Sequence, residues 1–354
     1  MNERLARDLD EILERARDDF ERLRGARLYV TGGTGFVGSW LLESFVHANA
    51  RLGLGAHAVV LTRDPAAFSA AVPHVASDPA LEFIRGDVRN TIPGGGAFDA
   101  ILHVATPASA KINDETPGLM VDTVIEGTRR VLDVAERSGA IPVLLTSSGA
   151  VYGRQPPQLA LVDETYGGAP DPLDPRSAYH ESKRLAELLF AISAHTCGTQ
   201  AKIARLFAFV GPYLPLDRHF AIGNFISDAM AGRVIEIKGD GTPVRTYLYG
   251  GDMTVWLWRI LLRGESARAY NVGSEETLSI RDTAEAVARC VEPHGSHVVR
   301  GTPDPERPPE RYVPCTKRAR GELGLTQWTP LDEAIRRTIA WHRAVRLPED
   351  VARP

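Results

Sequence analysis

A tyrosine and a lysine four residues apart point most directly to chemistry. Tyr179 and Lys183 stand in the sequence Tyr-His-Glu-Ser-Lys, and on a helix this spacing places both side chains on one face. A phenol has an ordinary pKa near 10, so a base that works near neutrality needs this pKa lowered by about three units, or about 4 kcal/mol. Positive charge beside the phenol favours its ionised form. The pair therefore predicts proton transfer at a substrate hydroxyl.

A hydroxyl-rich segment supplies the third candidate. Ser147 and Ser148 follow the apolar stretch at residues 141–145. Side chains at the carboxyl end of a strand in an open α/β sheet border the ligand crevice, where a hydroxyl can bond to a substrate oxygen. We expect Ser148 to bind substrate and to act in catalysis, whereas Ser147 satisfies the end of the strand.

Three glycines at three-residue spacing form a candidate phosphate-binding turn. Gly32, Gly35 and Gly38 follow an apolar run and open an apolar helical stretch. Glycine permits a tight turn and close approach to a pyrophosphate, and the following helix offers free N–H groups and its positive dipole end. Because strand, turn and helix come in the required order, we expect a dinucleotide to bind these glycines together with Phe36 and Val37.

Short apolar runs alternating with helical stretches must position these residues. The expected strands lie near residues 28–30, 58–61, 83–84, 100–102, 141–145 and 202–204. The helices between them are expected near residues 36–50, 117–138 and 177–196. Strands that are apolar on both faces are buried on both faces, and intervening helices require parallel crossovers. The sequence therefore predicts an α/β fold with a Rossmann-like, doubly wound parallel sheet.

Two further parts are expected beside this sheet. Residues 1–24 repeat apolar side chains at three- and four-residue steps, which predicts an extra amphipathic helix that packs on its own domain or on a second subunit. We assign residues 25–210 to the dinucleotide-binding domain, with a returning segment at about 248–275. Turn residues become frequent after residue 210, so residues 211–247 and 276–354 are expected to form a smaller α/β substrate-binding cap.

Composition excludes several classes of function. The 354 residues carry a net charge of −4, which favours no polyanionic partner, so nucleic acid is not expected. No apolar run approaches the roughly 20 residues that span a bilayer, and no membrane role is expected. Cys197, Cys290 and Cys315 match no metal-ligand spacing, and their odd number argues against a disulfide framework. We expect a cytoplasmic protein that binds no metal.

Together these motifs resemble the extended short-chain dehydrogenase/reductase family, of the NAD-dependent epimerase/dehydratase type that acts on nucleotide sugars. The resemblance covers about residues 25–345. It implies that Ser148, Tyr179 and Lys183 are the catalytic residues and that Tyr179 and Lys183 also contact the cofactor. It further implies that the dinucleotide is bound by Gly32, Gly35, Phe36, Val37, Gly38, Asp87, Val88 and Ala105.

The choice between NAD and NADP stays open. The second expected strand ends in Thr62-Arg63-Asp64, and Thr62 stands where NAD-specific relatives usually carry aspartate. Arg63 could pair with a 2′-phosphate or stack on adenine, and Asp64 could still turn toward the ribose. An epimerase would favour NAD, and a reductase would favour NADPH.

Substrate residues follow from the same resemblance. Arg245 matches an arginine that clamps the substrate diphosphate, because a guanidinium fork suits phosphate oxygens. Asn224 is expected to meet the pyrophosphate, since Ala208 replaces an asparagine that relatives often carry. Arg307, in a proline-rich stretch, is a weaker candidate.

Several functions compete on this evidence. Related 4,6-dehydratases carry an Asp-Glu pair directly after the catalytic hydroxyl, but here Gly149 and Ala150 cannot move a proton. We therefore expect a nucleotide-sugar C4 epimerase, with an NADPH-dependent 4-ketoreductase as the alternative. A dehydratase and a non-catalytic dinucleotide-sensing protein are less favoured. By resemblance, a homodimer would form through the helices at 117–138 and 177–196.

Overall fold

A seven-stranded parallel sheet forms the centre of the protein in the computed structural model, which describes residues 5–106, 110–139, 141–217, 220–306 and 308–350. The strand order is β3-β2-β1-β4-β5-β6-β11, and every neighbouring pair is parallel. The strands are β1 (Arg27–Thr31), β2 (His57–Thr62), β3 (Leu81–Arg85), β4 (Ala100–His103), β5 (Pro142–Ser148), β6 (Gln200–Leu206) and β11 (Arg268–Val272). The predicted doubly wound α/β fold is confirmed.

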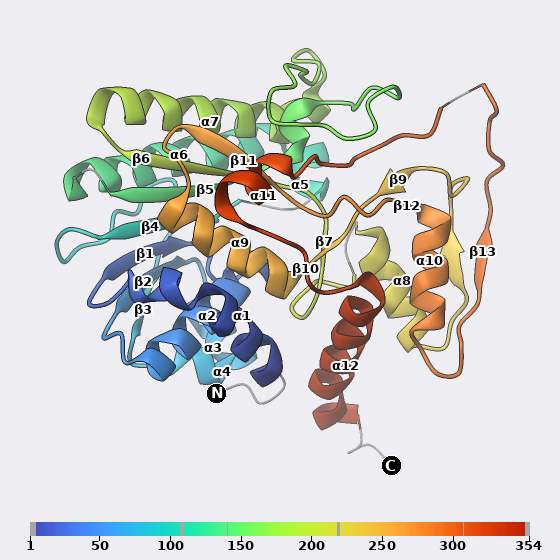
Figure 1. The fold of residues 1–354 in the computed structure, drawn as a ribbon, viewed down its shortest axis with the longest axis horizontal. Helices are drawn as coiled ribbons and strands as arrows, with labels where there is room; N and C mark the ends of the chain where they lie inside the picture. The colour runs from blue at the N-terminus through green and yellow to red at the C-terminus, as the bar shows by residue number, and fades with distance from the viewer. Residues whose placement is uncertain (1–4, 107–109, 140, 218–219, 307, 351–354) are drawn as a thin grey trace.

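Helices cover both faces of this sheet (Figure 1). Leu28 and Val30 pack on one side, with α2 (Phe36–Leu52) and α9 (Gly250–Arg263). Tyr29 points to the other side, where α6 (Pro117–Ser138) and α7 (Ala178–Cys197) lie. Burial on both faces explains why the strands read as continuous apolar runs. Shorter helical elements are α3 (Pro65–Ala71), α4 (Pro73–Ala76), α5 (Ala110–Glu115), η1 (Gly149–Tyr152) and η2 (Pro175–Ser177).

The helix α1 (Ala6–Glu21) adds a layer outside α2 and α9. Its Leu9, Ile12 and Phe20 side chains are buried in the same core cluster as those two helices. The fully buried Asp19 carboxylate pairs with Arg259 and Arg263 of α9. A predicted amphipathic helix is thus present, and it packs on its own chain.

A smaller α/β part stands beside the sheet, at the right of Figure 1. Here β8 (Ile235–Ile237) pairs with β13 (His297–Val299), and α8 (Ala221–Met230) packs on α10 (Ile280–Arg289). Outside the central sheet and the elements named so far, the described chain also contains β7 (Phe209–Val210), β9 (Val244–Arg245), β10 (Leu248–Tyr249), β12 (Leu278–Ser279), α11 (Lys317–Leu323) and α12 (Leu331–Asp350). We call residues 211–247 and 276–354 the cap, and its role in substrate binding stays a proposal.

Ion pairs join α1, near the start of the described chain, to α12, near its end. Arg337 of α12 pairs with Asp8 and Glu11 of α1 and with Glu333 of its own helix. Asp8 is buried, and burial raises the pKa of its carboxyl although the Arg337 guanidinium opposes this. The network therefore connects α1, which packs on α2 and α9, to a helix of the cap.

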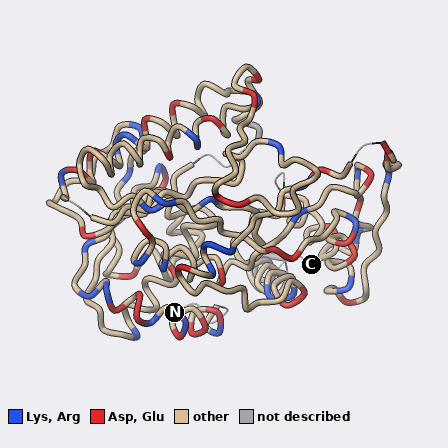
Figure 2. Tube along the Cα trace, turned by 45° about the horizontal axis from the view of Figure 1, so that its top comes forward, with Lys and Arg blue, Asp and Glu red and all other residues tan. Residues whose placement is uncertain are grey.

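Acidic and basic side chains are otherwise interspersed along the whole trace (Figure 2). Within the described ranges, no helix is long and apolar enough to cross a membrane. The same ranges contain no group of three or more His, Cys, Asp or Glu side chains arranged to hold a metal ion.

Candidate active site

The order of the strands reverses at β1, which has β2 on one side and β4 on the other. In open α/β sheets such a point leaves a crevice at the carboxyl ends of the strands, and ligands bind there. Gly32 follows β1 directly, with φ of +72°, and a Cβ atom on it would lie 2.5 Å from the backbone nitrogen of Ala105 beyond β4. Only glycine fits this position. The structure therefore brings Gly32 and Ala105 together, as predicted residues of one crevice.

The start of α2 is built to receive an anion. A Cβ atom on Gly38 would lie 2.3 Å from the Gly32 carbonyl oxygen, so this glycine lets the helix begin against the turn. Gly35 is the N-cap residue, no side chain caps the helix, and the nearest atom to a Cβ there would be 3.7 Å away. Phe36 and Val37 direct their side chains against the core and leave their N–H groups at the helix start. These features fit a dinucleotide pyrophosphate.

The three predicted catalytic side chains meet at the carboxyl end of β5. Ser148 ends this strand, and its Oγ accepts a hydrogen bond from the Ala150 N–H at 3.1 Å. Tyr179 lies in the first turn of α7, close enough to Ser148 for the serine hydroxyl to lower the pKa of the phenol. One turn later, the Lys183 ammonium is buried, and its Nζ donates to the Thr146 carbonyl at 2.7 Å. The lysine charge is thus fixed beneath the crevice.

Burial dominates the electrostatics of this site. It lowers the pKa of Lys183 to about 7, with partial opposition from the carboxylate of Glu187. Burial also raises the pKa of Tyr179, while its contact with Ser148 lowers it. The surrounding side chains alone do not lower the pKa of the phenol toward neutral pH. A base at Tyr179 therefore needs a further positive charge in the crevice.

A partly buried ion pair supports the end of β5, and no motif in the sequence pointed to it. Glu187 lies one turn beyond Lys183 on α7 and pairs with Arg205 of β6 at 2.7 Å. Ser147 donates to the same carboxylate at 2.5 Å. The predicted role of Ser147, to satisfy the strand end, agrees with this bond. The carboxylate also opposes the loss of the Lys183 proton.

The predicted adenine and ribose contacts surround the ends of β2 and β3. Asp87 accepts hydrogen bonds from the Arg89 side chain and backbone, and these bonds lower the pKa of its carboxyl. Val88 packs over Gly127 of α6. Asp64 does not turn into the crevice, because its carboxylate caps α3 by accepting the Ala67 N–H at 3.0 Å.

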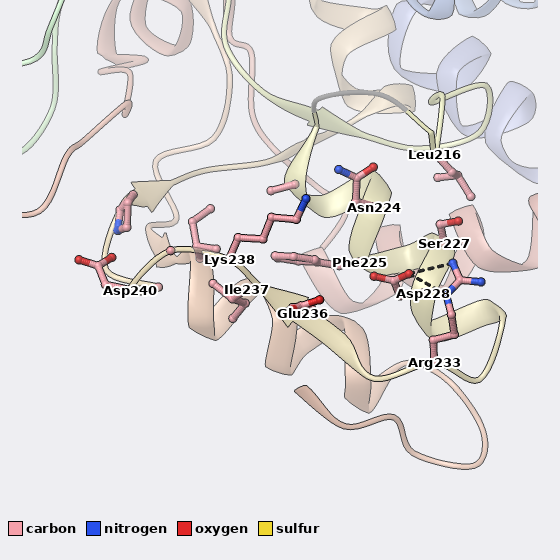
Figure 3. Close-up of a pocket in the computed structure, with 15 residues that line it drawn as sticks. Leu216, Asn224, Phe225, Ser227, Asp228, Arg233, Glu236, Ile237, Lys238 and Asp240 are labelled. Atoms are coloured by element: carbon pink, nitrogen blue, oxygen red, sulfur yellow. Dashed lines mark hydrogen bonds and ion pairs between the residues drawn. The ribbon is translucent and has the colours of Figure 1, made fainter. Parts of the chain in front are cut away.

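The cap contains a cavity of about 630 Å³ between α8, β8 and the turn at 239–243 (Figure 3). Asn224, a predicted substrate residue, lines it, and so does Lys238, which the sequence analysis did not select. Arg245 is the last residue of β9 and forms an ion pair with Glu310 at 3.3 Å. Arg307 lies outside the described residues. Asn224 and Arg245 thus belong to neighbouring parts of the cap, and not to the catalytic group itself.

A second tyrosine lies beside the end of β5. The ring of Tyr312, in the cap, packs at a tilt against Phe207 with centroids 4.7 Å apart, and its hydroxyl donates to the Leu206 carbonyl at 3.4 Å. A Cβ atom on Gly149 would lie 2.7 Å from the Tyr312 hydroxyl oxygen. Sequence analysis missed Tyr312, because 133 positions separate it from Tyr179 and it lies in no recognised motif.

The fold and the catalytic group together define an extended short-chain dehydrogenase/reductase. Residues 28–273 match the NAD dependent epimerase/dehydratase family. The chain belongs to this family and is an enzyme.

Curated relatives extend the comparison beyond the matched residues. UDP-glucuronic acid decarboxylase 2 of Arabidopsis thaliana is 32% identical over 87% of this chain, which spans 65% of that relative. UDP-glucuronic acid decarboxylase 6 of the same plant is 32% identical over 86% of this chain and 84% of the relative.

Solved structures agree in fold. A dTDP-glucose 4,6-dehydratase from Streptomyces venezuelae, determined with NAD bound, superposes with a TM-score of 0.74 and 25% identity over 90% of this chain and 97% of its own. A UDP-glucose 4-epimerase from Thermotoga maritima superposes with a TM-score of 0.73 over 90% of this chain and 99% of its own, and at 20% identity this match shows the fold alone.

Proposed function

We propose that this enzyme oxidises and then reduces C4 of a nucleotide sugar, and that its net reaction is C4 epimerisation. The observation that carries the proposal is an assembled Ser148, Tyr179 and Lys183 group with Gly149 and Ala150 beside it. Such a site can move one proton at one oxygen. It offers no acid–base pair at the next two residues, so elimination of water is not supported.

The side chains would act in a fixed order. Tyr179 takes the proton of the C4 hydroxyl, Ser148 donates a hydrogen bond to that oxygen, and Lys183 stabilises the phenolate by its charge. A bound oxidised dinucleotide supplies the hydride acceptor, a returning hydride and a positive charge beside the phenol. The 4-keto sugar rotates in the site so that its opposite face receives the hydride. Tyr179 then returns its proton to the sugar oxygen. The first-turn N–H groups of α2 and the glycines at 32, 35 and 38 would hold the pyrophosphate of the dinucleotide.

The cap cavity supports a nucleotide sugar as substrate. Pro243 lines the cavity, and the next residue, Val244, accepts a hydrogen bond from the Tyr312 N–H at 3.1 Å. The Tyr312 hydroxyl in turn lies against Gly149, the residue directly after Ser148, so a short chain of contacts joins the cavity to the end of β5. Lys238 and Arg245 give this path positive charge for a diphosphate. We infer that the nucleotide occupies the cavity and the sugar lies toward Ser148.

A direct assay tests the proposal. Purified enzyme is incubated with UDP-glucose, dTDP-glucose or UDP-glucuronate without added dinucleotide, and the sugars are analysed by chromatography and NMR. Appearance of the C4 epimer supports the proposal, whereas carbon dioxide release from UDP-glucuronate would reassign the enzyme to the reaction of its curated relatives. Tyr179→Phe must abolish turnover. Tyr166→Phe, which alters a tyrosine away from Ser148, is the matched control and must retain it.

One observation favours an NADPH-dependent 4-ketoreductase as the second candidate. The Asp64 carboxylate is engaged as a helix cap, and Thr62, whose hydroxyl lies 3.3 Å from that of Thr34, has no carboxylate. This strand end therefore places no carboxylate where ribose hydroxyls would bind. Arg63 is exposed at this strand end, where a 2′-phosphate could pair with it. For this second candidate we propose NADP as the cofactor. Arg63→Ala should weaken NADP binding about 10-fold or more and leave NAD binding unchanged. Equal loss for both dinucleotides would contradict this assignment.

We also propose a homodimer through α6 and α7. Apolar side chains that are partly or fully exposed gather on these helices, and burying them against a second copy would be favourable. They are Leu119, Val121, Leu185, Leu188 and Ile192.

A further inference from the structure

A threonine beyond β4 lies against the catalytic lysine. The two residues before it are fixed to the end of β1, where the Val104 N–H donates to the Thr31 carbonyl at 3.0 Å and the Ala105 N–H donates to the Thr31 hydroxyl at 3.3 Å. Thr106 follows them, and its Oγ1 lies 2.6 Å from Nζ of Lys183. The backbone beside the glycine turn therefore brings a hydroxyl to the charge carried by α7.

The chemistry of the two groups gives this bond its direction. A protonated lysine can only donate, whereas a threonine hydroxyl can also accept. The Lys183 ammonium therefore donates to Thr106, as it does to the Thr146 carbonyl at 2.7 Å. A hydrogen bond from a charged donor is about twice as strong as one between neutral groups, so each acceptor favours the ammonium over the neutral amine. The Thr146 acceptor belongs to the backbone, but the Thr106 acceptor can be removed by substitution.

The other groups around Lys183 leave its protonation closely balanced. Burial lowers its pKa to about 7, and the Glu187 carboxylate on the same helix opposes this but is also paired with Arg205 of β6. On β4, burial lowers the pKa of His103 to about 3, so its ring carries no charge near neutral pH. The Tyr179 phenol, whose pKa burial raises, adds no charge before it gives up its proton. Loss of one bond to the ammonium should therefore change the fraction of lysine that is charged.

We propose that Thr106 is a positioning residue whose hydroxyl accepts a hydrogen bond from the Lys183 ammonium and so keeps this charge in the crevice. The inference rests on the proposed function, in which the lysine charge stabilises the Tyr179 phenolate. Ala105, directly before Thr106, packs against Gly32. The charge of the catalytic lysine therefore depends on the same stretch of backbone that would border the dinucleotide.

Two substitutions at this position separate the hydroxyl from the rest of the side chain. Thr106→Val keeps the shape of the side chain and removes the acceptor, whereas Thr106→Ser removes a methyl group and keeps the acceptor. The side-chain nitrogens can be followed individually by NMR in ¹⁵N-labelled protein, because the chain has five lysines. Lys183→Met assigns the resonance of Lys183, which is then titrated in the wild type and in both threonine variants.

The titration has a definite expected result. The pKa of Lys183 should fall by about one unit in Thr106→Val, because one hydrogen bond to a charged group is lost, and should stay near the wild-type value in Thr106→Ser. Lys202 is the internal control, since its Nζ donates to the Gly264 carbonyl at 2.6 Å and burial also lowers its pKa. Its titration should be the same in all three proteins. An unchanged Lys183 pKa in Thr106→Val would refute the proposal, and so would an equal fall in Thr106→Ser.

The pH dependence of kcat/KM gives a second readout, because it reports the ionisable groups of the free enzyme. Relative to the wild type, Thr106→Val should lose about 10-fold at pH 8, where charged lysine is the minority form, and little at pH 5, where the lysine is charged in both proteins. A loss of the same size at both pH values would overturn the proposal and make Thr106 a packing residue. If the wild type turns over no nucleotide sugar, the proposed function fails, and the NMR titration still decides the role of Thr106.

Discussion

Replacing Lys183 with methionine should separate stability from activity. The wild-type ammonium is 2% exposed and donates to Thr106 Oγ1 at 2.6 Å and to the Thr146 carbonyl at 2.7 Å. Methionine has a similar length and no charge. Turnover should be lost, because nothing then favours the Tyr179 phenolate from this side.

The effect on stability depends on pH and has a definite sign. Burial lowers the pKa of Lys183 from 10.5 to about 7, so between these values the unfolded chain holds a proton that the folded chain lacks. Wild-type stability therefore rises with pH across this window by up to about 1.4 kcal/mol per pH unit, or about 5 kcal/mol in all. The variant lacks this contribution to the slope. The two lost hydrogen bonds cost it about 1 to 3 kcal/mol each at every pH.

Urea unfolding of both proteins at pH 6.5, 8 and 9.5 measures this difference. The free energy of unfolding of Lys183→Met, relative to that of the wild type, should be highest at pH 6.5 and should fall as the pH rises. Parallel pH dependence in the two proteins would refute a strongly lowered lysine pKa, whatever their absolute stabilities.

Three further predictions concern other parts of the molecule. Gly149→Ala should lower kcat in steady-state assays, because the added methyl group would lie 2.7 Å from both the Tyr312 hydroxyl and the Phe207 ring and so displace the residues directly after Ser148. Arg337→Met should lower the free energy of unfolding by about 3 kcal/mol in urea titrations, because it leaves the buried Asp8 unpaired, and this loss should shrink as the pH falls, because burial raises the pKa of that carboxyl. Leu188→Arg should convert a dimer into a monomer in light scattering while circular dichroism stays unchanged.

Much of the fold was predictable because its signals are local. The continuous apolar runs at β1, β2, β4 and β5 identified strands buried on both faces, and the glycine at 32 identified the turn after the first of them. Tyr179 and Lys183 could be paired because a helix fixes the relation between residues four apart. Ser148 could be added because strand ends meet at one edge of a parallel sheet.

Features that depend on tertiary contacts could not be predicted in this way. No spacing in the sequence relates Tyr312 to Gly149, since they meet only because backbone hydrogen bonds hold the segment 310–315 to Val244 on one side and to Val162 on the other. The partner of Asp64 depends on where α3 begins, and the sequence left that carboxylate free to turn inward. The charge of Lys183 could be named, but its lowered pKa follows from burial, which only the packed structure gives.

The position of α1 has a consequence for how the protein is made. Ribosomes deliver about 5 to 20 residues per second, so α9 follows α1 by roughly 10 to 50 seconds. During this interval Leu9, Ile12 and Phe20 cannot yet reach that partner, and Arg337 arrives later still. Although α1 leaves the tunnel long before α9, it is thus among the last elements to complete its packing, and a nascent chain that stalls before residue 250 would present an apolar stripe to chaperones.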